Sequence, residues 1–325
     1  MTYALPIAIL KPVEPSDAEA YASVIRAIHA DEVVDPDVLR VRWEEESSHP
    51  KNQARYLIVD GSSVLGLAFW ARPGIWVDGE PRLANVNVRM TKGHESNEVF
   101  GWILRGMEDA ARAAGADLAR AVTREDEPFH RRELKQHGYD VDRISRTWQL
   151  DLAKCAHSLL EARAASRQVM HERGVDIATA NAAKGGDAWK RLYDLTVATI
   201  PDIPTTVTEP LPSWDSWLST MHGPDVHEER IWTAWREGRL AGYSYLTYPA
   251  AGDVWTGYTA TNKLDRDLGI ARAVKLEAIG QAIELGISSI RTNNDLDNSA
   301  IIHINETLGY AALPGMITHL KSLKR

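Results

Sequence analysis

The stretch "YTATNKLDRDLGIARAVKLEAIGQAIELG", residues 258–286, decides how the fold of this chain is interpreted. Its pattern predicts a β-strand, a polar loop and then a long amphipathic helix that begins near Gly269. A glycine in the opening turn costs up to about 1 kcal/mol relative to alanine, and the helix has no proper side-chain cap. We therefore expect that a ligand uses the bare backbone N–H groups at this helix start.

An internal repeat extends the pattern to the rest of the chain. Residues 55–73 read "RYLIVDGSSVLGLAFWARP", and residues 230–249 read "RIWTAWREGRLAGYSYLTYP". Each stretch is a β-rich run, a turn that contains Gly61 or Gly238, and a second β-rich run that ends near a proline. Both therefore predict a β-hairpin.

Two pairs of glycines give this repeat a fixed offset. Gly115 and Gly286 each stand between a predicted helix and a predicted strand. They are separated by the same number of residues as Gly138 and Gly309. Matching offsets at separate signals predict two copies of one α/β unit, joined by a polar, Ala/Arg-rich helical linker. We place the first copy, the linker and the second copy at 1–152, 153–171 and 172–325.

Each copy is expected to run strand, helix, hairpin, strand, helix, strand, helix, strand. In the first copy, Ser16 and Glu19 have the spacing of a capping box, which predicts a helix that begins at Ser16. In the second copy, residues 175–178 predict a strand and residues 187–199 predict a helix.

Composition limits the classes of protein to consider. At 325 residues, the chain has the length of about two ordinary domains. The net charge of −8 argues against a nucleic-acid-binding surface. No apolar run approaches the ~20 residues of a membrane span, and the N-terminus lacks the basic region of a signal peptide. With a single cysteine and no metal-binding spacing among its 11 histidines, we expect a cytoplasmic protein without a metal site.

The second copy resembles a known family. Residues 266–271 read Arg-Asp-Leu-Gly-Ile-Ala after the strand "VWTGYTAT", and "TNNDLDNSAIIHINETLGY" follows at residues 292–310. Loop, helix, asparagines and Gly-Tyr in this order resemble the GNAT superfamily of acyl-CoA-dependent N-acyltransferases. The resemblance implies a mixed α/β (α+β mixed-sheet) fold with two tandem GNAT-like domains, a form similar to mycothiol synthase and its relatives.

The resemblance also implies a site for acetyl-CoA as co-substrate. The first N–H groups of a helix have no partners within the helix, so they and the helix dipole can bind a diphosphate. The resemblance places the pantetheine arm along the backbone of the preceding strand and adds asparagines from the later segment. The implied cofactor residues are Thr259, Ala260, Thr261, Arg266, Asp267, Leu268, Gly269, Ile270, Ala271, Arg272, Asn294, Asn298 and Asn305. For Asn298, an N-cap role and a cofactor role are compatible.

The first copy lacks this loop. At the repeat offset, Arg266, Gly269 and Ala271 correspond to Glu95, Glu98 and Phe100 in "TKGHESNEVFGWIL". Two carboxylates and a phenyl ring would repel or block a diphosphate. Lys92 and Gly93 could replace the motif only if the loop is shifted by a gap. We therefore expect the first domain to be a degenerate GNAT-like domain that does not bind acyl-CoA in the usual way.

The catalytic groups are not evident from the sequence. Many relatives have a tyrosine four residues before the Gly-aromatic pair, but here this position is Asn305, which cannot donate a proton at neutral pH. Tyr310 is expected to pack in the core. Asn305 is still a weak catalytic candidate, because its amide could hold a water or hydrogen-bond the sulfur. The weak candidates for a general base are Tyr258, Asp253, Glu229 and His303.

In this superfamily, the segment after the first helix determines acceptor specificity. Here residues 200–225 are proline-rich and contain Trp214, Trp217, Asp202, Glu209 and Asp215. One interpretation is a lid with an aromatic wall and carboxylates for a cationic amine. The other is a covering loop whose tryptophans fill the core.

Three functions remain open at this point. The leading hypothesis is an N-acetyltransferase that acts on the amine of a small-molecule acceptor in the second domain. The alternative is a non-catalytic acyl-CoA-binding or regulatory protein, favoured by the missing tyrosine. A third is an aminoacyl-tRNA-dependent transferase, which the acidic charge and the intact loop both disfavour. No nucleic-acid or membrane partner is expected, and the sequence does not indicate an oligomeric state.

Overall fold

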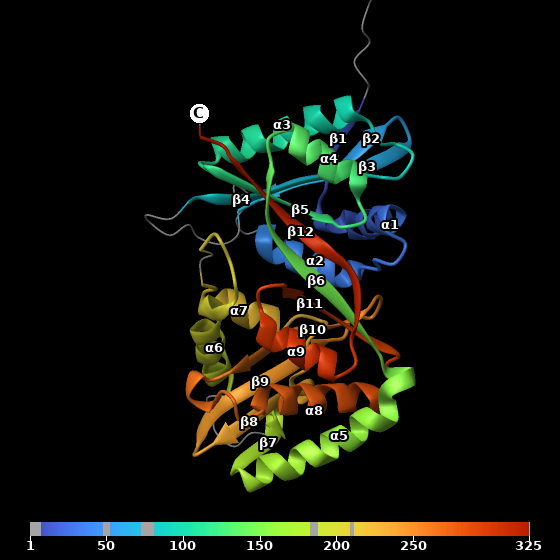
Figure 1. The fold of residues 1–325 in the computed structure, drawn as a ribbon. Coiled ribbons are helices and arrows are strands. Elements are labelled where there is room, and N and C mark those ends of the chain that lie inside the picture. Colours follow the sequence, from blue (N-terminus) through green and yellow to red (C-terminus); the bar gives the residue numbers. More distant parts are fainter. Residues whose placement is uncertain (1–7, 48–52, 73–80, 183–187, 209–210, 325) are drawn as a thin grey trace, which may run out of the picture. The chain divides into compact units, whose positions relative to one another are not determined.

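The computed structural model describes residues 8–47, 53–72, 81–182, 188–208 and 211–324 (Figure 1). It divides into two compact units. Unit 1 comprises Met1–Ile144, Thr205–Pro210 and Pro314–Arg325, and unit 2 comprises Ser145–Pro204 and Leu211–Leu313.

Unit 1 contains a mixed sheet whose only parallel pair within the described residues is β4–β5. Its strands lie in the order β1-β2-β3-β4-β5-β12. The predicted hairpin is confirmed, since β2 and β3 pair across a turn where Gly61 has a φ of 55°. The strand bounds are β1 (Ile9–Pro12), β2 (Gln53–Asp60), β3 (Ser63–Ala71), β4 (Leu83–Met90), β5 (Leu118–Arg124) and β12 (Ala311–Ser322).

Helices cover both faces of this sheet. Leu67 of β3 packs with Tyr21 and Trp43 on one face, whereas its neighbour Ala68 packs with Phe100 on the other. This alternation is the period-2 pattern of a strand buried on both sides. The helices of the first face are α1 (Ala18–Ile28) and α2 (Pro36–Ser47), and those of the second are α3 (Asn97–Ala113) and α4 (Pro128–Gln136).

The predicted capping box at Ser16 is wrong. Ser16 lies inside a 3₁₀ turn, Pro15–Asp17, and α1 begins two residues later than expected. The reciprocal cap belongs to this turn, because the Asp17 carboxylate accepts from the Glu14 N–H at 3.0 Å. Pro15 favours this result, since its fixed φ suits the first position of a helical turn.

Unit 2 repeats the plan with strands in the order β6-β11-β10-β9-β8-β7. Its hairpin turns at Gly238, where φ is 74°, as predicted. The strand bounds are β6 (Asp140–Asp151), β7 (Val175–Thr179), β8 (Ile231–Arg236), β9 (Arg239–Thr247), β10 (Val254–Thr261) and β11 (Ser289–Asp295). The predicted strand at 175–178 is therefore present, and the α/β class with mixed sheets is confirmed.

Five helices belong to unit 2 in the described part of the chain. The predicted linker is one of them, α5 (Leu152–Glu172), and it lies along α8 (Figure 1). The Glu277 carboxylate of α8 is buried and accepts from Arg163 and Arg167 of α5 at 2.5–2.6 Å. The others are α6 (Ala188–Thr199), α7 (Trp214–Met221), α8 (Ile270–Glu284) and α9 (Ser299–Thr307). Residue 187, the predicted start of α6, lies outside the described residues.

The last strand of each sequence copy completes the sheet of the other unit. Residues 316–322 of β12 pair antiparallel with β5 in unit 1, and residues 145–151 of β6 pair antiparallel with β11 in unit 2. The predicted domain bounds at residues 152 and 172 describe the sequence repeat, and they stay a prediction. The two compact units differ from the sequence copies because β6 and β12 are exchanged between them.

Candidate active site

Strands β10 and β11 separate near the middle of the unit 2 sheet. Among the described residues they pair only at Val254↔Ile290 and Trp255↔Arg291, and beyond these two pairs they diverge. A β-bulge follows at once, between Thr256 and Tyr258 on the β9 side. Gly257 is required there, since a Cβ would lie 2.1 Å from the Tyr245 ring. The result is a parted pair of strands with backbone groups along the gap.

The predicted pantetheine-binding residues line this gap. On β10, Thr259, Ala260 and Thr261 pair with β9 on one side. Their other side faces the region where β11 has diverged. The edge of β10 can therefore hydrogen-bond an extended ligand in the way a further strand would.

The loop that leads into α8 has the backbone shape of an anion site. Asp267 and Gly269 both have positive φ, 62° and 81°. For Asp267 this conformation is unusual and is the kind of local strain that clusters at functional sites. Gly269 is the N-cap of α8 and, in the described structure, makes no side-chain cap. The opening N–H groups of α8, from Ile270 to Arg272, thus have no intrahelical acceptor and suit a phosphate.

Neighbouring arginines hold this loop in place. The carboxylate of Asp265 is buried and accepts from Arg239 and, at 3.2 Å, from Arg236. The carbonyl of Leu268 accepts from Arg173 at 2.5 Å. The loop is therefore fixed by side chains of β8, β9 and the residue that follows α5, which preorganises its backbone for binding.

Arg266, the predicted charge partner of a diphosphate, is held by a carboxylate. Its guanidinium lies 2.5 Å from Asp202, and the Lys263 ammonium lies 3.1 Å from the same carboxylate. Partial burial would raise the pKa of Asp202, but hydrogen bonds from Arg266 and Lys263 keep it below the usual value. A diphosphate would compete with Asp202 for both cations.

The asparagines of the later segment lie on β11 and α9. Asn298 caps α9 through its Oδ1 and the Ile301 N–H at 3.4 Å, as predicted, while its cofactor role stays a prediction. Asn305 is fully buried and donates to Asn294 Oδ1 at 2.7 Å. Tyr310 packs in the core, which confirms that prediction.

The candidates for a general base lie on separate elements of unit 2 and do not form one cluster in the described structure. Tyr258 shares a 3.1 Å hydrogen bond with Thr199, and burial raises the pKa of its phenol. Asp253 precedes β10, at the end remote from the loop, and pairs with Arg291 at 2.9 Å. Glu229 contacts its neighbour Arg230 at 3.6 Å. His303 is exposed on α9. Of these, only Tyr258 stands on the diverging part of β10.

Aromatic side chains of α6 and α7 pack together in unit 2. Trp214 and Trp217 stack with ring centroids 5.8 Å apart, and Tyr193 lies 5.3 and 5.5 Å from them. These residues belong to the same apolar cluster as Tyr243 and Tyr258. The tryptophans therefore contribute to the core of unit 2 and also border the residues at the bulge. Asp215 is exposed, and Glu209 lies outside the described residues.

In unit 1 the helix that corresponds to α8 has an ordinary start. The Ser96 hydroxyl caps α3 by accepting from the Val99 N–H at 3.4 Å. Glu95 and Glu98 are exposed beside this start, and Phe100 is fully buried below it. The start of α3 therefore has a side-chain cap and two neighbouring carboxylates, whereas the start of α8 has no side-chain cap.

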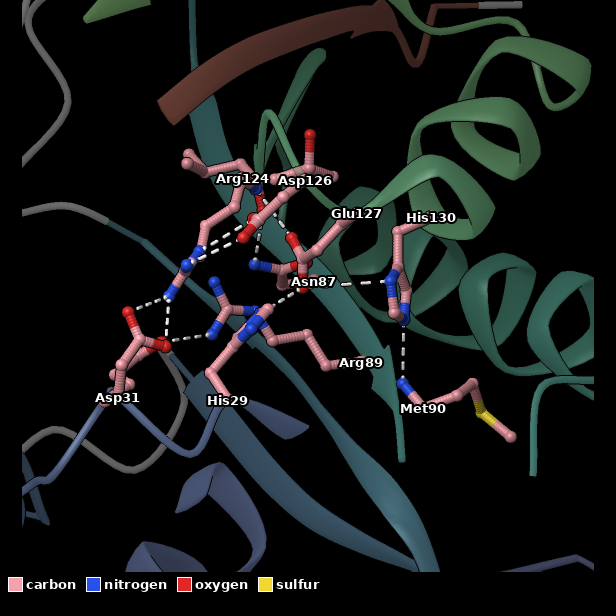
Figure 2. Close-up of polar contacts among 12 residues, drawn as sticks. His29, Asp31, Asn87, Arg89, Met90, Arg124, Asp126, Glu127 and His130 are labelled. Carbon is pink, nitrogen blue, oxygen red and sulfur yellow. Dashed lines mark hydrogen bonds and ion pairs between the residues drawn. The ribbon is translucent and has the colours of Figure 1, made fainter. Parts of the chain in front are cut away.

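Polar side chains of unit 1 form a cluster of hydrogen bonds and ion pairs beside β4 and β5 (Figure 2). The buried His130 of α4 accepts a hydrogen bond from the Met90 N–H at 2.9 Å, using Nε2. Glu127 shares a 2.7 Å hydrogen bond with His29 and accepts from the Arg124 N–H at 2.6 Å. A backbone donor of β4 that could meet a ligand is thus already paired. Sequence patterns gave no signal for this cluster, because its members come from distant segments.

Protonation of His130 should destabilise the fold at acidic pH. Burial lowers its pKa to about 4, with Arg89 and His29 acting in the same direction and Glu127 opposing them. The unfolded chain takes up this proton near pH 6.5, so stability falls as the pH drops from 6.5 to 4. We expect a loss of about 2 to 3 kcal/mol in unfolding free energy, measured by chemical denaturation.

The control is His130→Gln, whose amide oxygen can accept from Met90 without titrating. This variant should lose distinctly less stability over the same range. Titration of Glu127 does not account for the expected loss of stability between pH 6.5 and about 4.3. Burial would raise its pKa, but the bond to His29 and the charge of Arg89 bring it to about 2. Its contribution is therefore lost only below about pH 4.3. Equal slopes for both proteins would contradict the assignment.

Several solved structures with a similar fold are named as GNAT acetyltransferases. A GCN5-related N-acetyltransferase from Sphaerobacter thermophilus is similar with a TM-score of 0.70 and 16% identity, covering 99% of this chain and 98% of that one. A tandem GNAT protein from the clavulanic acid biosynthesis pathway is similar with a TM-score of 0.70 and 14% identity, covering 98% and 99%. A GNAT-family acetyltransferase from Colwellia psychrerythraea has a TM-score of 0.58 at 11% identity, covering 97% and 99%. No protein-family model and no curated protein matches the sequence.

These similarities define the class of fold. The chain has the mixed α/β GNAT fold, and it has it twice in tandem, as the sequence resemblance implied. In the described ranges, no helix is long and apolar enough to cross a membrane. The same residues contain no group of three or more His, Cys, Asp or Glu side chains arranged to hold a metal ion.

Proposed function

We propose that the protein is an N-acetyltransferase that transfers an acetyl group from acetyl-CoA to the amine of a small-molecule acceptor, in unit 2. One observation carries the proposal. The uncapped start of α8, shaped by Asp267 and Gly269, opens beside the diverging strands β10 and β11. A diphosphate and an extended arm would then be bound by neighbouring backbone groups. A cytoplasmic location, expected from the sequence, is part of the proposal.

The residues of unit 2 fit the parts of this co-substrate. The N–H groups that open α8 would hold the diphosphate, with Arg266 added once it leaves Asp202. The edge of β10 from Thr259 to Thr261 would pair with the arm. When bound, acetyl-CoA supplies the activated acyl group. Tyr258 stays protonated at neutral pH because burial raises its pKa, so it acts as a hydrogen-bond donor and not as a base.

We further propose that unit 1 has no acyl-CoA site. Ser96 caps the helix start that would face a diphosphate, and His130 occupies the Met90 N–H. Phe100 fills the position of Ala271 in the repeat. The role of unit 1 is then structural, and it includes the sheet whose strand β5 pairs with β12.

The experiment is a measurement of thiol release from acetyl-CoA by the full chain over a panel of small amines, beside a calorimetric binding measurement. We expect amine-dependent release together with binding of one acetyl-CoA per chain. Binding without release for any amine would favour the alternative, a non-catalytic acyl-CoA-binding or regulatory protein, for which the asparagine at position 305 is the supporting observation. Absence of binding would refute both.

A further inference from the structure

Lys275 is a buried lysine whose ammonium has no hydrogen-bond partner among the described residues. It lies on α8, one and a half turns after Ile270, and its side chain is only 2% exposed. Among the described residues, no group accepts a hydrogen bond from its Nζ. Nζ lies 5.4 Å from the centroid of the Tyr310 ring, which is a cation–π distance. A lysine amine that is buried without an acceptor costs free energy, so its retention calls for a use.

Further buried polar atoms of unit 2 lack a hydrogen bond among the described residues. Thr256 is the first residue of β10 beyond the last β10–β11 pair, and its hydroxyl is close enough to Tyr310 to lower the pKa of a phenol that burial raises. Neither hydroxyl completes a hydrogen bond within the described structure. On α9, Asn305 Oδ1 is also buried and unpaired in the part of the chain described. Strand β10, helix α8 and the segment that follows α9 thus bring polar groups to the point where the strands part.

We propose that Lys275 is the proton donor for the thiolate that leaves in acetyl transfer, in place of the tyrosine that the sequence lacks at position 305. This inference rests on the proposed function. It identifies the root of the β10–β11 gap, at Thr256 and the Tyr310 ring, as the place where the sulfur lies, within reach of Nζ.

The proton balance is complete with groups already named. The neutral acceptor amine forms a C–N bond to the thioester carbon, the C–S bond breaks, and the sulfur keeps the electron pair. The Lys275 ammonium gives this sulfur a proton and becomes a neutral amine. The new amide nitrogen loses its extra proton to solvent, and Lys275 regains one from solvent. The products are an amide and a free thiol.

The acidity of Lys275 suits this role. Burial lowers its pKa to about 8, and a thiol of the cysteine kind has a pKa of about 8.5. Proton transfer is efficient when donor and acceptor are matched near the working pH. The titratable group that faces Nζ is the Tyr310 phenol. The nearby Glu277 carboxylate of α8 is paired with Arg163 and Arg167 of α5. Among the described residues, Nζ has no hydrogen-bond partner.

A binding experiment tests contact between Nζ and the sulfur without any turnover. Lys275 in the full-length protein, labelled with ¹⁵N and ¹³C at its side chain, would be titrated by NMR alone, with CoA, and with desulfo-CoA, which has no thiol. We expect the apparent pKa to rise by about one unit with CoA relative to desulfo-CoA, because an ammonium and a thiolate stabilise each other. Identical titrations with both bound ligands would overturn the inference and leave the proposed function intact. If neither ligand binds, the proposed function fails and this inference fails with it.

A kinetic experiment separates proton donation from a structural role. Lys275→Met preserves the length of the side chain and removes the proton. We expect kcat with acetyl-CoA to fall about 100-fold or more while the Kd for CoA stays within about threefold. The loss should largely disappear with the selenoester of CoA, because a selenolate leaves without a proton at neutral pH. The matched control is Lys154→Met, at an exposed lysine of α5, which should not change kcat. An equal loss with both esters, or a collapse of CoA binding, would overturn the role.

Discussion

Ala271→Glu should abolish acetyl-CoA binding and leave the stability of the protein unchanged or slightly higher. Ala271 lies in the first turn of α8 and is not fully buried. A carboxylate at a helix start interacts favourably with the helix dipole, by about 0.3 to 1 kcal/mol. The same carboxylate would face the diphosphate. Two unit charges 4 Å apart repel by about 4 kcal/mol at an effective dielectric constant of ~20, which corresponds to a loss of roughly a thousandfold in affinity.

Isothermal titration calorimetry with acetyl-CoA and a thermal unfolding curve would measure the two effects on one protein. Ala271→Gln has the same shape without the charge and should lose much less affinity. Glu98→Ala in unit 1 is the second control, since Glu98 stands beside the corresponding helix start and should not affect binding. The Ala271→Glu titration also tests unit 1, because a second site there would leave measurable binding. Binding at the wild-type affinity would refute the site in unit 2.

The parts of the fold that sequence reasoning predicted are those with local causes. The hairpins at Gly61 and Gly238 follow from alternating residues around a turn glycine. The bare start of α8 follows from one glycine and the absence of a cap. The cap formed by Asn298 follows from residue type and position alone. Each of these depends on a few neighbours in sequence, so the residues themselves carry the information.

The features that escaped prediction depend on residues far apart in the chain. The bond between His130 and Met90 joins α4 to β4, and only the folded sheet brings them together. The burial of Lys275 was not predicted, because its neighbour Tyr310 follows α9 and is brought to α8 only by the fold. The sheets that β6 and β12 join were not predicted for the same reason. A repeat in sequence suggests that each copy is closed on itself, yet strand pairing decides which copy a strand completes.

Truncation after Leu313 should unfold unit 1, although it removes only the C-terminal end of the chain. Residues 316–322 form a seven-residue antiparallel ladder with β5. Ile317 and Leu323 are buried, and each should contribute about 1.5–3 kcal/mol. The Lys321 ammonium also pairs with the buried Glu108 of α3 at 2.7 Å. Together these losses approach the 5–15 kcal/mol that holds a whole domain folded.

Hydrogen exchange would localise the effect. We expect the amides of β5 and α3 to lose protection in the truncated protein, while those of α8 keep theirs, because α8 and its neighbours belong to unit 2. A chain that ends at Leu323 keeps the ladder and is the matched control, with exchange like that of the full-length protein. A fragment cut at residue 152 lacks β12 as well, so it should fail to fold for the same reason. Full protection of β5 after truncation would mean that β12 does not complete the unit 1 sheet, and the exchange of last strands would then be wrong.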